Sequence, residues 1–295
     1  MNTSPPVPSP VPSPGQSPGQ SQIQSPVQTL AQCAVDVLTT ADGRAKAALS
    51  RTHAAAWQAA RANGTAPPVG HAAPPEKPAR PVHPALLQPR DMPRRGPGTP
   101  DGRMALLHAV AHIELNAIDL HWDIIARFAH IPMPAGFYDD WVKAADEEAK
   151  HFNLMCDCLE AGGSHYGALP AHDGLWRAAQ DTATDLLGRL AVVPMVLEAR
   201  GLDVTPGMIQ IFHTAKDAAA IAALQTIYAE EVAHVAYGSK WFNFLCGRAD
   251  LDPKDQFHAL VRRYFHGSLK PPFNVEKRAE AGIPPDFYWP LAEPA

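Results

Sequence analysis

The sequence predicts an all-α protein whose centre is a bundle of four long helices. Between residues 103 and 248, apolar side chains recur with helical periodicity and there is little strand signal. Start and stop signals divide this stretch into segments of about 25 residues, or about 37 Å at 1.5 Å per residue, which is the length of bundle helices. With 46% hydrophobic residues, the chain can also fill a sizeable core.

Helix signals locate these four segments. Thr99 and Pro100 open the first, Asp173 and Asp217 are natural N-caps of the third and fourth, and Gly201 is expected to end the third. A short extra helix, "GMIQIFHTA", should follow Thr205-Pro206. Pro194 should kink the third helix, because it removes a backbone N–H one turn before Glu198. The expected long helices cover residues 103–129, 137–161, 173–200 and 217–247.

Proline usage divides the rest of the chain. The Pro/Ser/Gln/Gly-rich start has almost no apolar content and should be disordered, and a second proline-rich tract resembles a linker or wrapping arm. Between these tracts lies an Ala-rich stretch that breaks at Asp42-Gly43, which predicts a helical hairpin. The predicted disordered tail, hairpin, arm, four-helix bundle, and final helix with an irregular tail occupy residues 1–27, 28–66, 67–102, 103–248 and 249–295.

Charge and composition limit the partners. A net charge of −5 indicates no strong preference for nucleic acid or membranes, and the longest apolar runs are too short to cross a bilayer. No basic segment followed by an apolar stretch opens the chain, so we expect a cytoplasmic protein without a secretion signal. The cysteines have no disulfide or zinc-ribbon spacing and are expected to be reduced; they are Cys33, Cys156, Cys158 and Cys246.

The most informative pattern is a repeated Glu-Glu-x-x-His. It occurs in "AADEEAKHFNL" of the second predicted helix and in "YAEEVAHVAYG" of the fourth. At about 100° per residue, Glu148 and Glu231 fall within the apolar face of their helices, with His151 and His234 one turn further on. The preceding acids of each motif turn away by about 100° and are expected at the rim of a site or supporting its ligands.

The other two helices each add one inward carboxylate. Glu114 lies on the apolar face of the first helix and Glu198 on that of the third. An isolated buried carboxylate costs several kcal/mol, so such a group protonates or finds a cation. Glu114 and Glu148 are 34 residues apart, and Glu198 and Glu231 are 33 apart, as two antiparallel helix pairs with their carboxylates at one level would require.

This set is that of a ferritin-like dimetal carboxylate bundle, with one Glu from each of two helices and one Glu-x-x-His from each of the others. Four carboxylates balance two divalent cations. Oxygen donors with one imidazole per metal favour two iron ions, with Fe/Mn or manganese as alternatives, over zinc. A metal-free bundle with coincidental polar sites is the other interpretation. The predicted ligands are Glu114, Glu148, His151, Glu198, Glu231 and His234.

Two further side chains are candidates for a catalytic role. His121 follows Glu114 by two helical turns on the same face, where it would support the ligands or be an ordinary core histidine. Tyr228 lies one turn before Glu231, where it would hydrogen-bond a ligand, shuttle an electron or simply fill the core.

Several other positions on the four helices keep two interpretations. Asp119 and Asp123 either accept N–H bonds from ligand histidines or lie on a solvated face. His108 and His112 point away from the ligand face and fit packing or surface roles. Gly238 either leaves a gap beside the metals that admits dioxygen or a substrate, or permits close helix packing.

From about Gln28 to Phe287, the chain resembles the ferritin-like family catalogued as domain of unknown function 455. The resemblance is carried by "LLHAVAHIELNAIDLHWDIIARF", "FYDDWVKAADEEAKHF", "YGALPAHDGLW", "LEARGLDVTPGM" and "KPPFN". It implies the fold and the metal site, with all six ligand positions intact, but no substrate. By analogy with this fold, Glu148 and Glu231 are expected to bridge the metals.

Two classes of function follow. The first is an oxidase or hydroxylase that uses O2 and an external electron donor on an unknown substrate, with the arm and the tail covering the bundle mouth. A weaker variant hydroxylates tRNA and draws on Arg80, Arg90, Arg94 and Arg95. The second class is an iron-handling protein, of ferroxidase or storage type, or a non-catalytic metal binder. The sequence leaves the oligomeric state open.

Overall fold

The computed structural model describes residues 1, 3, 28–93 and 96–292. Most of the predicted disordered tail, together with Arg94 and Arg95, lies outside the described residues. Within them the prediction of an all-α protein is confirmed, and extended pairing is limited to two isolated bridges, Leu86 with Ala171 and Leu269 with Ala292. None of the helices in the described part combines the length and apolar content needed to cross a bilayer.

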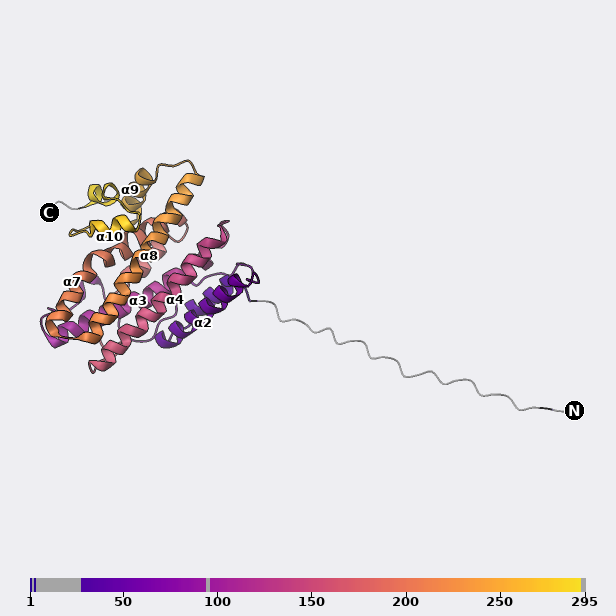
Figure 1. Ribbon diagram of the computed structural model, residues 1–295, viewed down its shortest axis with the longest axis horizontal. Coiled ribbons are helices and arrows are strands. Elements are labelled where there is room, and N and C mark those ends of the chain that lie inside the picture. The colour runs from indigo at the N-terminus through magenta and orange to yellow at the C-terminus, as the bar shows by residue number, and fades with distance from the viewer. Residues whose placement is uncertain (2, 4–27, 94–95, 293–295) are drawn as a thin grey trace.

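Four helical rods form the body of the molecule (Figure 1). They are α3 (Pro100–Arg127), α4 (Ala135–Ala161), α8 (Ala218–Arg248) and a composite rod of α6 (Leu186–Val192), η2 (Val193–Glu198) and α7 (Ala199–Ala215). The helix α3 packs most extensively on α4, and α8 contacts α4, α6, η2 and α7. Most buried apolar side chains of these rods belong to one continuous core, whereas Leu120 of α3 and Val193 of η2 join a small second cluster with Trp176 and Ala179.

The boundaries of α2, α3 and α8 follow from local hydrogen bonds. The side chains of Asp42, Thr99 and Asp217 each accept a hydrogen bond from the backbone N–H three residues on, as N-cap residues do. The helix α8 follows a left-handed Lys216, at φ 59°, which turns the chain back along α7. These caps agree with the start signals in the sequence.

The prediction of one helix over residues 173–200 is wrong. The helix α5 (Gly174–Asp181) begins after Asp173, whose side chain makes no capping bond, and ends early; Asp185 then caps α6 by accepting from Gly188 N at 2.9 Å. Pro194 opens the π-helical segment η2, which is the distortion expected near Glu198. A proline can therefore interrupt the regular backbone hydrogen bonds of a helix without ending the helical rod.

The expected stop at Gly201 and the separate helix after Thr205-Pro206 are also wrong, because α7 runs through both positions. Pro206 has no N–H to give to the carbonyl of Leu202. That carbonyl instead accepts a hydrogen bond from Asn274 Nδ2, at 3.2 Å. A partner distant in sequence thus satisfies the group that the proline leaves free.

Two N-terminal helices pack on the pair formed by α3 and α4. The helices α1 (Leu30–Thr39) and α2 (Gly43–Ala62) contact α3 and α4, respectively, more extensively than they contact each other. Ser50 of α2 is fully buried, donates to the carbonyl of Ala145 and accepts from Trp122 Nε1. Both helices therefore belong to the main core rather than to a separate unit.

The C-terminal region is more helical than the irregular tail that the sequence suggests. After α9 (Pro253–Tyr264) come α10 (Val275–Glu280), α11 (Pro285–Tyr288) and η3 (Trp289–Leu291), which lie against the α7–α8 end of the molecule in Figure 1. Arg278 of α10 is buried and forms a bidentate ion pair with Asp203 of α7, at 2.9 and 2.7 Å. In the arm, the described residues include the single turn η1 (Pro89–Asp91).

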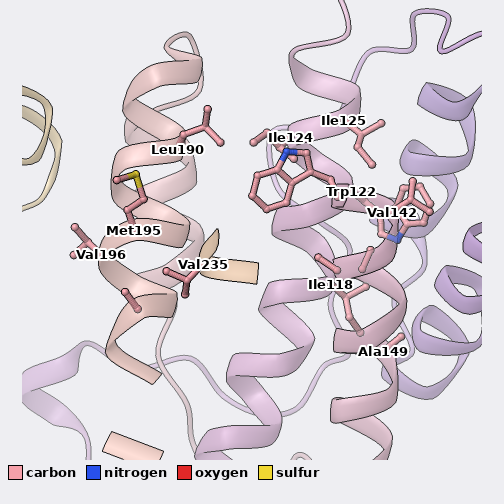
Figure 2. Packing of buried hydrophobic residues seen from close by; sticks show 14 of the residues in the cluster. Ile118, Trp122, Ile124, Ile125, Val142, Ala149, Leu190, Met195, Val196 and Val235 are labelled. Atoms are coloured by element: carbon pink, nitrogen blue, oxygen red, sulfur yellow. The ribbon is translucent and has the colours of Figure 1, made fainter. Parts of the chain in front are cut away.

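The rods approach closely at Gly238. A Cβ atom at this position would lie 2.5 Å from both Cβ and Cγ of Pro194, so the proline ring occupies the space beside the glycine. Figure 2 shows Leu190, Met195 and Val196 on the neighbouring α6–η2 rod, with Val235 of α8 beside them. Of the two interpretations of Gly238, the gap for dioxygen is wrong and close packing is correct.

Candidate metal centre

The structure brings the six predicted ligands together in the interior. Glu114 comes from α3, Glu198 from the end of η2, and each Glu-x-x-His pair from α4 or α8. The side chains of Glu148, His151 and His234 are fully buried, and the most exposed of the six, Glu231, is 11% exposed. Because each rod contributes from its inward face, residues more than 100 positions apart meet at one level.

Glu148 lies at the centre of this cluster. Its Oε1 is 2.9 Å from His234 Nδ1, and its Oε2 is 3.4 Å from His151 Nδ1. On the outer sides, His151 Nδ1 is 3.5 Å from Glu114 Oε2 and His234 Nδ1 is 3.7 Å from Glu231 Oε1. The two oxygens of one carboxylate therefore face two different histidines.

These separations fit shared coordination. A cation that binds donors at about 2.1 Å in octahedral geometry holds adjacent donors about 3 Å apart and opposite donors about 4.2 Å apart. The four distances above lie between 2.9 and 3.7 Å. Donor atoms of Glu114, Glu148, His151 and Glu231 also lie within 4.8 Å of one another.

Several of these atoms are buried without a hydrogen-bond partner in the protein. His234 Nδ1 and Glu148 Oε1 are within ion-pair distance but are not oriented for a hydrogen bond, as expected of two donors that face a common third point. Both oxygens of Glu198 also lack partners. Unpaired buried polar groups are costly, so the donor set fits bound cations better than an empty core.

Burial sets the protonation of the metal-free cluster. It raises the pKa of Glu198 to about 7, and the charge of Glu231 adds to the effect. Burial, reinforced by the charge of Glu148, also raises the pKa of Glu114 and Glu231. Burial opposes the charges of Glu148 and His151 too, but contacts between imidazoles and carboxylates prevail, lowering the pKa of Glu148 and raising that of His151.

We expect the metal-free protein to lose stability as pH rises. A carboxyl whose pKa is raised on folding contributes stability at pH values below its pKa in the unfolded chain. For Glu198, this contribution is lost between about pH 4.5 and 7. The raised pKa values of His151 and His234 act in the same direction above pH 6.5. Thermal unfolding in chelator should give a lower Tm at pH 8 than at pH 5.5, with a smaller drop in Glu198→Gln; a rise in Tm would contradict this arrangement.

The first acid of each motif supports the histidine of the other motif. Glu230 Oε2 accepts from His151 Nε2 at 2.7 Å, and Glu147 Oε2 accepts from His234 Nε2 at 3.0 Å. This hydrogen bond from His151 is the largest cause that lowers the pKa of Glu230 to about 2. With Nε2 as the donor, each imidazole presents its Nδ1 to the cluster, which is the orientation that a ligand requires.

Removing the carboxylate of Glu230 or of Glu147 should weaken metal binding without abolishing it. We expect Glu230→Gln to lower metal affinity by about 10–100-fold, because His151 loses its charged acceptor. Isothermal titration with Mn²⁺ measures this change. Glu160→Gln is the control, since Glu160 is an exposed α4 acid paired with Arg44. Equal affinities in both variants would assign Glu230 a surface role only.

The two candidate catalytic residues have different positions. His121 is buried beside the cluster, with Nε2 3.6 Å from Glu148 Oε1 and 3.7 Å from Glu198 Oε1. Tyr228 instead accepts a hydrogen bond from Asn274 Nδ2 at 2.7 Å, which ties it to the C-terminal region. The tyrosine ring nearest His234 in the aromatic packing is that of Tyr237, three residues further along α8, at 6.4 Å between centroids. Tyr237 is not among the predicted site residues, although its i+3 spacing from His234 is a usable signal.

Both interpretations of Asp119 and Asp123 are wrong. Each carboxylate is fully buried and pairs with cations rather than with a ligand histidine or with water. Asp119 pairs with Lys46 and with Arg80 Nη2, and Asp123 pairs with Arg127 and with Arg189 Nη1, at 2.6 Å. The helix wheel could not show this, because α2, the arm and α6 cover the face.

His108 and His112 pack in the interior, which confirms one of their two interpretations. Both are buried, and His108 Nε2 accepts from the backbone N–H of Gly167. The ring nitrogens of His112 contact Tyr166 Oη at 2.8 Å and the carbonyl oxygen of His172 at 3.1 Å. All four cysteines are free.

Comparisons with known proteins place the chain in a family. A family model described as "Protein of unknown function (DUF455)" matches residues 39–289. An uncharacterized protein of Haemophilus influenzae is 40% identical over 210 residues, which cover 70% of this chain and 73% of that protein. No solved structure matches the chain. The extent of the family match shows that the chain belongs to the DUF455 family.

Proposed function

We propose that this protein is a ferritin-like dimetal carboxylate oxidoreductase that uses O2 to oxidise or hydroxylate a small substrate. The observation that carries the proposal is the central position of Glu148, whose two oxygens face His234 and His151 separately. One carboxylate that serves two imidazoles fits a bridge between two cations. A single cation would use only one of these two oxygen–nitrogen pairs.

The donor chemistry favours iron, with manganese as the alternative. The four carboxylates match the charge of two divalent cations, and the unpaired oxygens of Glu198 support a cation as their partner. Carboxylate and imidazole donors suit iron and manganese, whereas structural zinc prefers four-coordinate sites that often contain thiolate. No cysteine belongs to the group of donor atoms.

Two Fe(II) ions, when bound, would supply electrons for the reduction of O2, and an external donor would restore them. The residues of this chain would hold and orient the ions, with Glu148 and Glu231 as shared ligands, Glu114 and His151 on one side of Glu148, and Glu198 and His234 on the other. Glu230 and Glu147 keep the imidazole N–H groups directed outward. The apolar core around the cluster excludes water, which strengthens each charge interaction.

A cavity beside η2 supports a small-molecule substrate. Its volume is about 650 Å³, within the range of about 300–1,000 Å³ that is usual for ligand sites. Leu197, the neighbour of Glu198, lines it together with Leu86 of the arm, Leu175 of α5 and Phe265 after α9. The arm and the C-terminal region thus both border this cavity.

Nothing in the part of the chain that the structure describes favours the tRNA variant. Arg80 is occupied by its ion pair with buried Asp119, at 2.9 Å, and by a hydrogen bond to Asn116. Arg90 is exposed next to Asp91, and the other two arginines lie outside the described residues. The basic stretch therefore includes at least one arginine that holds the arm to α3.

Anaerobic reconstitution with Fe(II) tests the proposal. We expect two irons per chain, and rapid mixing with O2 should consume it with a transient visible absorption band. A protein that binds two irons but is inert to O2 would be a metal binder without this activity. Hundreds of irons per chain in a large cage on gel filtration would instead indicate storage.

A further inference from the structure

The side chain of His121 has no role in the six-ligand set, although it lies at the same cluster. Its ring is buried, and Nε2 lacks a hydrogen-bond partner in the protein. The contacts of Nε2 with Glu148 Oε1 and Glu198 Oε1, at 3.6 and 3.7 Å, are too long for hydrogen bonds. Most buried imidazole nitrogens have a hydrogen-bond partner.

The same distances fit a metal ligand. They lie within the range of about 3–4.2 Å that separates donors around one cation, as the other distances in the cluster do. Donor atoms of His121, Glu148 and His234 lie within 4.8 Å of one another. Packing fixes the orientation of the His121 ring, which stacks on Trp141 at 5.3 Å and meets His234 edge-on at 5.7 Å.

We propose that His121 is a seventh metal donor, which makes the two metal positions chemically unequal. The proposal rests on the dimetal centre of the proposed function. The position beside His234 is supplied by His121, Glu198 and Glu148 Oε1, and so has two imidazoles. The position beside His151 has one imidazole, with Glu114 and Glu148 Oε2, and Glu231 is within reach of both positions. A small anion from outside therefore binds at the position beside His151, which has fewer protein donors.

Cobalt(II) titration tests the ligand assignment, because each bound Co(II) contributes visible absorption that depends on its donors. The test variant is His121→Phe, which keeps a ring against Trp141 and removes the nitrogen. The control is His53→Phe, since His53 is a half-buried histidine of α2 that also has an unpartnered Nε2 and a tryptophan neighbour, but lies outside the donor groups.

We expect wild type and His53→Phe to bind two Co(II) ions per chain. His121→Phe should weaken one of the two ions by more than about 100-fold, which exceeds the effect of a residue that only supports a ligand. Unchanged affinities and an unchanged spectrum in His121→Phe would overturn the proposal. Thermal unfolding of the metal-free variants checks the fold, and His121→Gln replaces His121→Phe with the same expectations if the latter does not fold.

Azide tests the inequality of the two positions. With both cobalt ions bound, the wild-type protein should take up one azide per chain, and His121→Phe, at saturating cobalt, should take up two. Equal azide stoichiometry in the two proteins would contradict the proposal. Fewer than two cobalt ions in the wild type would defeat the dimetal centre itself, whereas two ions with a normal His121→Phe would defeat only the role of His121.

Discussion

Glu148→Gln should lose both metal ions. Glutamine has the same shape and fits the same buried space, but it removes the negative charge and one of the two oxygens that face His151 and His234. Because outer-shell substitutions alone cost about 10–100-fold in affinity, the loss of a central ligand should exceed about 100-fold for each metal. Metal analysis after dialysis and isothermal titration with Mn²⁺ measure the effect.

The metal-free form of this variant should be less stable than metal-free wild type, because the buried imidazoles of His151 and His234 lose the carboxylate that they contact. Thermal unfolding of the metal-free variant therefore separates loss of the site from loss of the fold. The matched control is again Glu160→Gln on the same helix, which should keep both ions. If Glu148→Gln still binds two ions with wild-type affinity, Glu148 is not a bridging ligand and the centre is arranged differently.

Asp123→Ala should destabilise the fold by about 3–5 kcal/mol. It leaves Arg189 buried at 1% exposure without a counter-charge, and breaking a buried ion pair from one side has a cost of this size. The pair joins α3 to α6, the helix that leads directly into η2 and Glu198. Urea unfolding of the metal-free protein, analysed by linear extrapolation, gives the change in free energy.

Two comparisons define this experiment. Asp157→Ala removes the exposed partner of Arg44 and should cost at most about 1 kcal/mol. The double variant Asp123→Leu with Arg189→Met replaces both charges by apolar groups and should recover most of the loss. A loss below about 1 kcal/mol for Asp123→Ala would show that Arg189 finds other support, for example from Thr182 and the carbonyl of Ala179.

The sequence predicted the parts of the fold that depend on local periodicity. The inward faces of α3, α4 and α8 follow from the 3.6-residue repeat, and their N-caps follow from the chemistry of Thr99 and Asp217. Glu114, Glu148 and Glu231 were placed together by the same rule. These three carboxylates lie at the same height along the bundle because each belongs to a long helix of regular geometry.

What the sequence could not predict depends on partners from distant segments. The third rod continues past Pro206 because Asn274, 68 residues later, satisfies the carbonyl of Leu202. Asp119 was placed off the ligand face correctly, but the cations that cover it come from α2 and the arm. The helical wheel placed His121 on the correct face. That His121 Nε2 has no hydrogen-bond partner became apparent only with the neighbouring rods in place.

Anomalous X-ray diffraction from crystals loaded with Mn²⁺ locates the bound metals directly. We expect two anomalous peaks per chain, one between Glu148 Oε2 and His151 and the other between Glu148 Oε1 and His234, each within about 2.3 Å of its donors. A single peak, or peaks away from the carboxylate of Glu148, would contradict the proposed dimetal centre.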